Sequence, residues 1–397
     1  MIMLNDQQLE LVDKIIDWYK NLYRGSECAH YSSIDELKFV YSGPAGSGKT
    51  TVVKYIIEKL NLKRNEYISA AYVGKAVTQL QKNGLRAKTI HSLIYYAKLV
   101  VKTRPDGTLY PAYEFILKEH LSDNLKLIII DEAGMVNDKM VKEILGFDKP
   151  VIFMGDMNQL PPVFGNSSIM EKPDYVLTKI MRQNKDNPII KLSQMVLNDI
   201  PLFEGDYGTS KVVNSFQLYP DIIRDFDQII CNTNKLREYI NNTIRYDFLG
   251  YNDKRPRLFE KVICRQNNWD EYVNGFALTN GTTGILTDID YSTVARGYYT
   301  VDFKPDFFPE GMEFSKLRLD AQYIKLDYQT QRNTNRLHNE KFEYAYAITT
   351  HLSQGETYKK VLYFDSFLHD KNMTKRARYT AITRASDSVI IVKPNKY

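Results

Sequence analysis

The strongest indication of the fold is the segment Phe39-Val40-Tyr41-Ser42-Gly43-Pro44-Ala45-Gly46-Ser47-Gly48-Lys49-Thr50. Its first three residues are apolar and predict a short buried strand, and residues 50–60 predict a helix. Residues 43–50, between them, fit the phosphate-binding pattern G-x-x-x-x-G-K-[S/T] at every position. A chance glycine-rich turn would lack the flanking strand and helix, so we predict an α/β nucleotide-binding domain.

The chemistry of a phosphate-binding loop gives its residues defined roles. Glycines let backbone N–H groups close around phosphate oxygens, and the helix that follows presents its positive N-terminal end. Lys49 is expected to neutralise the β- and γ-phosphates, and the Thr50 hydroxyl is expected to hold Mg²⁺. The predicted nucleotide-binding residues of this segment are Gly43, Pro44, Ala45, Gly46, Ser47, Gly48, Lys49, Thr50 and Thr51.

A pair of acidic residues follows a second apolar run. Leu127-Ile128-Ile129-Ile130 predicts a buried strand that delivers Asp131 and Glu132 to its carboxyl end. We expect Asp131 to reach Mg²⁺ through water and Glu132 to polarise the attacking water as general base. Two acids can also simply cap a strand, but the phosphate loop upstream favours a nucleotide site. The predicted cofactors are therefore ATP and Mg²⁺, although GTPases and some kinases share this loop.

The rest of the chain divides by its patterns. Apolar runs at residues 67–73, 125–130 and 150–154 alternate with helical stretches, which predicts a parallel sheet with helices on both sides. Residues 99–110 predict a hairpin around a Pro-Asp-Gly turn. From about residue 250 to 339, short β-type runs between Gly, Asn and Pro predict a small all-β unit. These runs are residues 261–265, 284–288, 297–303 and 321–328.

Size and composition restrict the class of protein. The 397 residues suggest two to four structural units, and 43% hydrophobic with 25% charged residues excludes a mainly disordered chain. A net charge of only +5 does not indicate a basic surface overall, so binding of nucleic acid would need a local basic groove. The 29 tyrosines and 18 phenylalanines can fill cores or stack on bases. Three dispersed cysteines, no signal peptide and no run of about 18 apolar residues predict a cytoplasmic protein without membrane spans.

Six short motifs in a fixed order decide the family. Together they resemble the motifs of superfamily 1 helicases, most closely the Dda and RecD branch. The motifs are residues 71–76, 89–93, 131–133, 155–163, 347–355 and 379–385. Any one of them is a weak signal, but the set spans nearly the whole chain and is highly specific.

The resemblance implies an architecture and an activity. It implies two RecA-like P-loop domains with ATP between them, single-stranded DNA crossing both, translocation from 5′ to 3′ and duplex unwinding. The expected partners are single-stranded DNA and fork or overhang DNA, and RNA is an alternative substrate for translocation. We also expect a monomer that acts in the cytoplasm of a bacterial or phage-infected cell. Expected domains are 1A (residues 1–91 and 122–180), 1B (92–121), 2A (181–250 and 340–397) and 2B (251–339).

The resemblance also carries nucleotide-site roles onto matching positions. Gln8 is the better match for the adenine-reading residue, with Gln7 possible, although a polar helix start would explain both. Gln159 resembles the γ-phosphate sensor. Arg182 and Arg384 resemble the two arginines that stabilise charge developing at the γ-phosphate, and a surface salt bridge is the alternative for each. Gly355 resembles a nucleotide contact at the end of its motif.

Contacts to the nucleic acid strand follow from the same motifs. The predicted strand-binding residues are Lys75, Thr89, His91, Thr349 and His351, whose amine, hydroxyl and imidazole groups can bind phosphates without reading sequence. A buried, hydrogen-bonded histidine is the usual alternative for His91 and His351.

Two insertions complete the resemblance. The hairpin at residues 102–110 occupies the position of a strand-separating pin, but its tip carries no aromatic residue, so Tyr110 or Tyr113 would have to replace one. The β unit resembles the SH3-like fold of the second domain, with residues 280–284 at its usual turn. A P-loop ATPase that remodels or clamps protein–nucleic acid complexes, without processive unwinding, is the alternative function.

Overall fold

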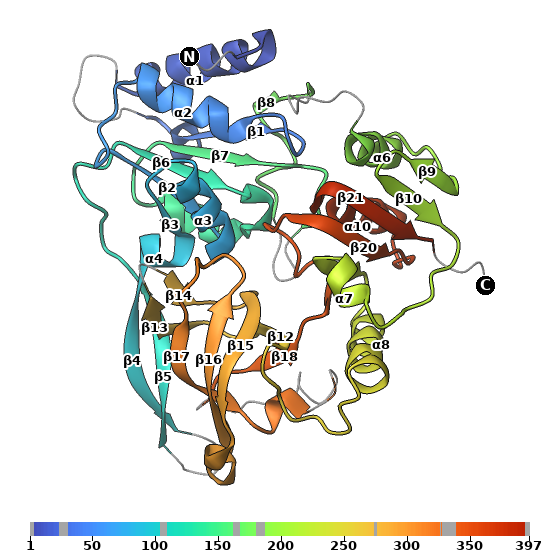
Figure 1. Ribbon diagram of the computed structural model, residues 1–397. Helices are drawn as coiled ribbons and strands as arrows, with labels where there is room; N and C mark the ends of the chain where they lie inside the picture. The colour runs from blue at the N-terminus through green and yellow to red at the C-terminus, as the bar shows by residue number, and fades with distance from the viewer. Residues whose placement is uncertain are drawn as a thin grey trace. The chain divides into compact units, whose positions relative to one another are not determined.

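The computed structural model describes residues 4–23, 31–103, 109–161, 167–179, 187–273, 276–325, 327 and 339–393. The chain divides into two compact units. The first contains residues 1–98 and 115–185, and the second contains residues 99–114 and 186–397. Each unit contains a parallel sheet, which Figure 1 shows in blue to green for the first unit and in green to red for the second.

The first unit is built on a six-stranded sheet in the order β3-β2-β6-β7-β1-β8, and every neighbouring pair is parallel. The central strands β6 and β7 are almost completely buried, as their continuous apolar sequences predict. The predicted parallel sheet is therefore confirmed. The strands are β1 (Lys38–Ser42), β2 (Tyr67–Ala71), β3 (Ala87–Thr89), β6 (Leu127–Asp131), β7 (Val151–Gly155) and β8 (Tyr175–Val176).

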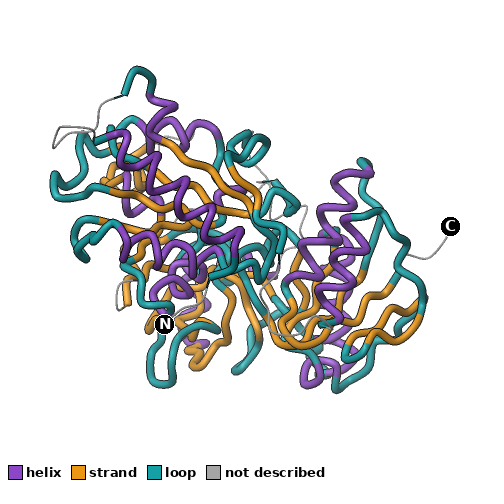
Figure 2. The backbone as a smooth tube through the Cα atoms, turned by 90° about the horizontal axis from the view of Figure 1, so that it is seen from above, coloured by secondary structure: helices purple, strands orange, loops and turns teal. Residues whose placement is uncertain are grey.

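Helices flank the strands of this sheet, as Figure 2 shows. Apolar residues on one stripe of each longer helix pack onto the sheet, while the opposite stripe is polar. No helix in the described parts of the chain is long and apolar enough to cross a membrane. The elements are α1 (Asp6–Leu22), η1 (Ile34–Leu37), α2 (Lys49–Lys59), α3 (Gly74–Lys82), α4 (Ile90–Ile94), η2 (Ala133–Met135) and α5 (Asp138–Leu145).

A long hairpin extends the chain where the sequence predicts one. Strands β4 (Tyr95–Thr103) and β5 (Leu109–Leu117) form a separate two-stranded sheet. The Pro-Asp-Gly turn proposed as the tip lies at residues 105–107, outside the described residues. Tyr110 and Tyr113 both lie in β5.

The second unit contains a sheet in the order β19-β11-β20-β21-β10-β9, parallel except for the β9–β10 pair. Its strands are β9 (Gly205–Tyr207), β10 (Ser210–Val213), β11 (Gln228–Cys231), β19 (Ala347–Thr349), β20 (Tyr358–Phe364) and β21 (Ala385–Val392). Its helices are α6 (Pro188–Leu197), α7 (Ile222–Asp225), α8 (Asn234–Thr243), the π-helix η3 (Ile244–Phe248) and α10 (Lys371–Thr383).

An antiparallel sheet in the order β17-β16-β15-β12-β18 forms the predicted β unit. The predicted strand at residues 321–328 is wrong, because that run contains the 3₁₀ helix η5 (Tyr323–Lys325), and β17 (Phe314–Asp320) precedes it. The assignment as an SH3-like fold stays a prediction. The other elements are β12 (Lys261–Cys264), β13 (Asn268–Val273), β14 (Phe276–Leu278), β15 (Thr283–Asp290), η4 (Tyr291–Arg296), β16 (Tyr298–Pro305) and β18 (Phe342–Tyr344).

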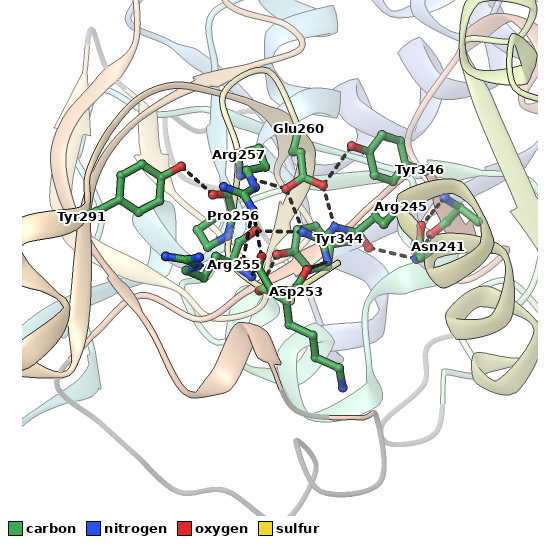
Figure 3. A network of polar contacts seen from close by, with 12 residues as sticks. Asn241, Arg245, Asp253, Arg255, Pro256, Arg257, Glu260, Tyr291, Tyr344 and Tyr346 are labelled. Atoms are coloured by element: carbon green, nitrogen blue, oxygen red, sulfur yellow. Dashed lines mark hydrogen bonds and ion pairs between the residues drawn. The ribbon is translucent and has the colours of Figure 1, made fainter. Parts of the chain in front are cut away.

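A buried arginine joins this antiparallel sheet to the helix before it (Figure 3). Arg245 of η3 forms an ion pair with Glu260 at 2.6 Å, and each side chain is only 1% exposed. Arg245 also donates to the carbonyl oxygens of Asp253 and Arg255, and its guanidinium lies 3.8 Å from the ring centre of Tyr344. The network therefore fixes the chain segments that enter and leave the antiparallel sheet.

Candidate nucleotide site and strand-binding edge

The phosphate loop connects the end of β1 to the start of α2. Gly46 and Gly48 both have a φ of 82°, a left-handed conformation that side chains with a Cβ rarely adopt. The Lys49 ammonium donates to the carbonyl oxygens of Gly43 at 2.7 Å and Pro44 at 3.3 Å. Lys49 therefore lies folded over the loop, where a phosphate group could replace the carbonyl oxygens as its partner.

Two observations test whether a triphosphate fits this loop. The Ser47 hydroxyl is buried and has no hydrogen-bond partner in the part of the chain that the structure describes. A Cβ built on Gly43 would lie 2.5 Å from that hydroxyl, so a side chain at residue 43 would displace the Ser47 hydroxyl from its present position. Buried hydroxyl groups normally have a partner, so the loop presents an unused polar group as well as backbone N–H groups. These features fit a bound phosphate.

Gln8 lies against the same loop. Its side-chain nitrogen donates to the carbonyl oxygen of Ser47 at 2.9 Å, and the residue is buried. Gln8 also forms a capping box with Asn5 at the start of α1, so the helix-start interpretation accounts for part of its contacts. Gln7 points elsewhere, toward Thr178 and the backbone of Lys179. Of the two glutamines, Gln8 is the one that contacts the loop.

The acidic pair lies at the carboxyl end of β6, as the sequence predicts. Burial and the charge of Glu132 raise the pKa of Asp131 to about 7, against the opposing effect of Lys49. Glu132 adopts a φ of 51° and its N–H donates to the Asp131 carboxylate at 2.8 Å. A left-handed conformation at a non-glycine residue is strained, and such strain clusters at functional sites. Asp131, Glu132 and Lys49 therefore form one electrostatic group.

The loop after β7 closes this edge of the first sheet. The N–H of Met157 donates to the Ser42 hydroxyl at 3.0 Å, and Gly43 donates to the carbonyl oxygen of Gly155 at 3.0 Å. Gln159 follows on this loop and is buried. The ends of β1, β6 and β7 meet at one edge because the strands are parallel, which brings the predicted sensor to the edge of the phosphate loop. Residues 162 and 163 of this motif lie outside the described residues.

The predicted strand-binding residues of the first unit lie at the same carboxyl edge. Lys75 is in the first turn of α3, which follows β2, and Thr89 ends β3. The Thr89 hydroxyl already caps α4 by accepting from the N–H of Ser92 at 3.2 Å. His91 lies in α4, and burial lowers the pKa of its imidazole, so the neutral form is favoured.

Aromatic rings surround His91. Its ring centre lies 5.4 Å from that of Tyr72, 5.7 Å from Tyr95 and 5.9 Å from Phe115. Tyr72 and Phe115 are 38% and 40% exposed, so part of each ring reaches the surface beside His91. Sequence analysis did not single out these two residues. Only the hairpin brings Phe115 back to Tyr72, so no local pattern could have paired them.

Several polar side chains lie at the carboxyl ends of the parallel strands in the second unit. Thr349 ends β19 and is buried, and burial lowers the pKa of His351. The Thr350 hydroxyl donates to Asn232 at 2.8 Å, and Asn232 donates to the Tyr363 hydroxyl at 2.9 Å. Sequence analysis overlooked Asn232, although the polar run that follows the apolar strand β11 was a usable signal.

The predicted nucleotide residues of this unit gather near the opposite edge of that sheet. Gly355 has a φ of 74° and precedes β20, while Arg384 ends α10 just before β21. Arg384 is buried and donates to the carbonyl oxygens of Glu356 at 3.0 Å and Thr380 at 3.1 Å. The surface salt bridge considered for Arg384 does not fit this burial. Arg182 lies outside the described residues.

Two domain families match the chain and define its class. The AAA domain matches residues 29–201, which include the phosphate loop and the acidic pair. The UvrD-like helicase C-terminal domain matches residues 344–392, which include Thr349, Gly355 and Arg384. The first part of the chain is thus similar to an AAA domain, and a segment near its end is similar to a helicase C-terminal domain.

Two individual proteins are also similar to this chain in sequence. The ATP-dependent RecD2 DNA helicase of Deinococcus radiodurans is 25% identical over 413 residues, covering 94% of this chain and 50% of that protein. The ATP-dependent DNA helicase dda of Enterobacteria phage T4 is 29% identical over 240 residues, covering 51% of each. The chain therefore spans about half the length of these two relatives.

A solved structure supports the fold. Bacteroides Pif1 bound to single-stranded DNA matches with a TM-score of 0.54 and 19% identity, over 98% of this chain and 92% of that one. The structural match shows the fold alone, whereas the domain families and the two sequence relatives confirm the predicted resemblance to superfamily 1 helicases of the Dda and RecD branch.

Proposed function

We propose that this protein is an ATP-dependent DNA helicase that moves from 5′ to 3′ along single-stranded DNA and unwinds duplex. The observation that carries the proposal lies within the first unit. There the phosphate loop, the Asp131–Glu132 pair and the predicted strand-binding residues share the carboxyl edge of one parallel sheet. An ATP-driven motor needs this adjacency, because a change at the phosphates must reach the strand through short, rigid segments.

The nucleotide site supports hydrolysis by groups of this chain. Lys49 would exchange its carbonyl partners for phosphate oxygens, and Glu132 would orient the attacking water and accept its proton. Thr50 and Asp131 would hold Mg²⁺, which supplies positive charge to the phosphate oxygens when bound. The raised pKa of Asp131 fits this role, because a carboxyl group that is costly to ionise alone becomes ionised beside a cation.

Assigned residues in the second unit support the same reaction. We assign Gly355 to the nucleotide, and Arg384 and Arg182 to the charge that develops on the γ-phosphate. The guanidinium of Arg384 is held in place by carbonyl acceptors within its own unit, so it needs little reordering to act. Gln8 is assigned to adenine and Gln159 to the γ-phosphate.

For the nucleic acid, we assign Lys75, Thr89, His91, Thr349 and His351 to phosphate or base contacts. The two histidines favour the neutral form, which can donate one hydrogen bond without adding charge. The exposed rings of Tyr72 and Phe115 would add sequence-tolerant stacking beside His91. No base-specific reader is needed for a motor that travels along any strand.

Domain assignments follow from the resemblance. We propose domains 1A (residues 1–91 and 122–180), 1B (92–121), 2A (181–250 and 340–397) and 2B (251–339), with an SH3-like fold for 2B. We further propose that the protein acts as a monomer in the cytoplasm, with fork or overhang DNA as its substrate.

Unwinding of asymmetric substrates tests the proposal directly. Duplexes with only a 5′ overhang or only a 3′ overhang are incubated with protein, ATP and Mg²⁺, and strand release is measured. We expect release from the 5′-overhang duplex alone. Release from the 3′-overhang duplex would overturn the polarity, and a failure of single-stranded DNA to stimulate ATP hydrolysis would overturn the motor itself.

A remodelling or clamping ATPase is the competing function. It would share the nucleotide site but would not need a strand separator. Alanine substitutions at the ends of the hairpin strands, Thr103→Ala and Leu109→Ala, distinguish the two. Loss of unwinding with DNA-stimulated ATP hydrolysis intact supports the helicase, whereas unchanged unwinding would remove the hairpin from the mechanism.

A further inference from the structure

A second cationic pocket lies in the first unit, away from the nucleotide site. It is a cavity of about 160 Å³. Its apolar floor consists of buried side chains, and its walls carry cationic and amide or hydroxyl groups. The lining residues are Asn65, Ile68, Arg86, Lys88, Leu93, Lys118, His120, Leu121, Ser122 and Leu125.

Positive charge in this pocket is not neutralised by its walls. Arg86, Lys88 and Lys118 line it, and none of its described lining residues is a carboxylate. Arg86 and Lys118 therefore lie beside Lys88 in the same pocket, and burial, with the charges of Lys118 and Arg86, lowers the pKa of Lys88. Apolar floor residues lower the local dielectric and strengthen the repulsion between these like charges.

The structural roles of two of these cations differ. Lys118 donates to the carbonyl oxygens of Ser92 at 2.9 Å and Leu93 at 2.8 Å, so it caps the end of α4. Lys88 is half-buried on the edge strand β3, and no hydrogen bond or ion pair within the described residues holds its ammonium group. The contacts of the described residues therefore show no stabilisation of the fold by the Lys88 charge, although partial burial of that charge costs free energy.

We propose that this pocket binds a phosphate group through Arg86, Lys88 and Lys118. An oxyanion would relieve the repulsion, and Asn65 and Ser122 would add neutral donors. The pocket is distinct from the phosphate loop. Arg86 precedes the edge strand β3 and Lys88 lies in it, and strands β2, β6 and β7 separate β3 from β1, whose end begins the phosphate loop.

Lys88→Met tests the proposal, because methionine keeps the length of the side chain and removes its charge. Thermal unfolding is measured in inorganic phosphate and in chloride of equal ionic strength, with saturating ADP and Mg²⁺ so that the phosphate loop stays occupied. The wild-type midpoint should rise by roughly 3 °C at about ten times the Kd for phosphate. The rise should disappear in Lys88→Met and persist in Lys142→Met, a change at an exposed lysine of α5.

Stability without phosphate gives a second readout. Removing a repelled charge should leave the midpoint of Lys88→Met in chloride equal to or above the wild-type value. A fall of more than roughly 2 °C would show that the ammonium group has a structural role and would overturn the proposal. An absent phosphate effect in the wild type, or an undiminished one in Lys88→Met, would also overturn it.

An oligonucleotide distinguishes the source of the phosphate. The affinity for a 12-nucleotide oligo(dT) is measured against salt concentration for both proteins. If the pocket binds a backbone phosphate, the slope of log K against log salt should fall by about one in Lys88→Met. If the slope is unchanged while the phosphate effect is lost, the ligand is a free phosphate compound. Neither measurement uses ATP hydrolysis or unwinding, so the proposal can fail or stand independently of the helicase function.

Discussion

Replacing Glu260 with glutamine isolates the charge of the buried network shown in Figure 3. Glutamine keeps the size of the side chain, so the change removes the negative charge and leaves packing nearly intact. Arg245 would remain 1% exposed and fully charged, and it would lose ion-pair contacts at 2.6 and 3.2 Å. Its remaining acceptors would be the backbone carbonyl oxygens of Asp253 and Arg255 and the single amide oxygen of the substituted side chain, which carries no charge.

The expected cost follows from this geometry. At 2.6 Å and an effective dielectric of about 20, two unit charges attract by roughly 6 kcal/mol before desolvation is subtracted. Breaking such a pair by removing one partner costs about 3–5 kcal/mol, because an uncompensated charge stays buried. The carbonyl acceptors and the Tyr344 ring keep part of the compensation, so we expect the lower end, about 3 kcal/mol.

Tryptophan fluorescence can follow the β unit, in which β13 and β14 form a two-stranded sheet next to the five-stranded one in the chain. The chain has two tryptophans, and Trp269 lies in β13. In a Trp18→Phe background, the thermal midpoint of the Trp269 signal should fall by at least roughly 6 °C in Glu260→Gln. Asp253→Asn is the matched control, since it breaks the more exposed pair with Arg255 in the same segment and should cost under about 1 kcal/mol.

Two outcomes would refute this account. A shift below about 2 °C in Glu260→Gln would mean that Arg245 is hydrated or finds another partner. The double change of Arg245 and Glu260 to methionine should recover at least half of the loss, because no charge then stays buried. A double variant as unstable as Glu260→Gln would show that packing, and not charge, sets the cost.

Four further changes test the nucleotide site. Glu132→Gln should bind ATP and single-stranded DNA but turn over very slowly, because an amide cannot accept the proton of the attacking water; near wild-type turnover would remove Glu132 as base. Arg384→Ala should lower turnover by roughly 10³ or more, and Arg384→Lys should restore little because lysine lacks the bidentate fork; a normal rate would exclude the role. Gly48→Ala should abolish binding of a fluorescent ATP analogue, since its Cβ would lie 2.4 Å from the Gln8 side-chain nitrogen at a φ of +82°, and retained binding would contradict that clash. In the folded protein the pKa of Asp131 is raised to about 7, whereas in the unfolded chain it is about 4. Between about pH 4 and pH 7 the Asp131 carboxyl group is therefore protonated in the folded protein and ionised in the unfolded chain. Stability should therefore fall as the pH rises from about 4 to 7, and an equal slope of thermal midpoint against pH in Asp131→Asn would contradict the shift.

Short motifs predicted much of the fold, because the backbone conformation and burial that they require depend on residues close together in the sequence. Gly46 and Gly48 permit a loop conformation that few other residues adopt, and the apolar runs of β6 and β7 could only be buried on both faces. Short apolar runs correctly predicted strands β12, β15 and β16, but one such prediction failed. Residues 321–328 resemble a strand by composition, but Tyr323 and Ile324 bury themselves in a single 3₁₀ turn, and hydrophobic periodicity cannot separate these cases.

The class of nucleotide site, the parallel sheets and the helicase motifs could be predicted before folding was known, since each depends on residues close together in the chain. Which charges are buried, and which neighbours they contact, became known from the folded chain alone. Arg245 and Lys88 are both basic residues, and nothing near them in the sequence separates their roles. In the folded chain Arg245 pairs with Glu260, 15 residues away, whereas Lys88 lies near the like charge of Lys118. Electrostatic energy depends on distance in space and on exclusion of water, and the order of residues along a chain specifies neither until the chain has folded.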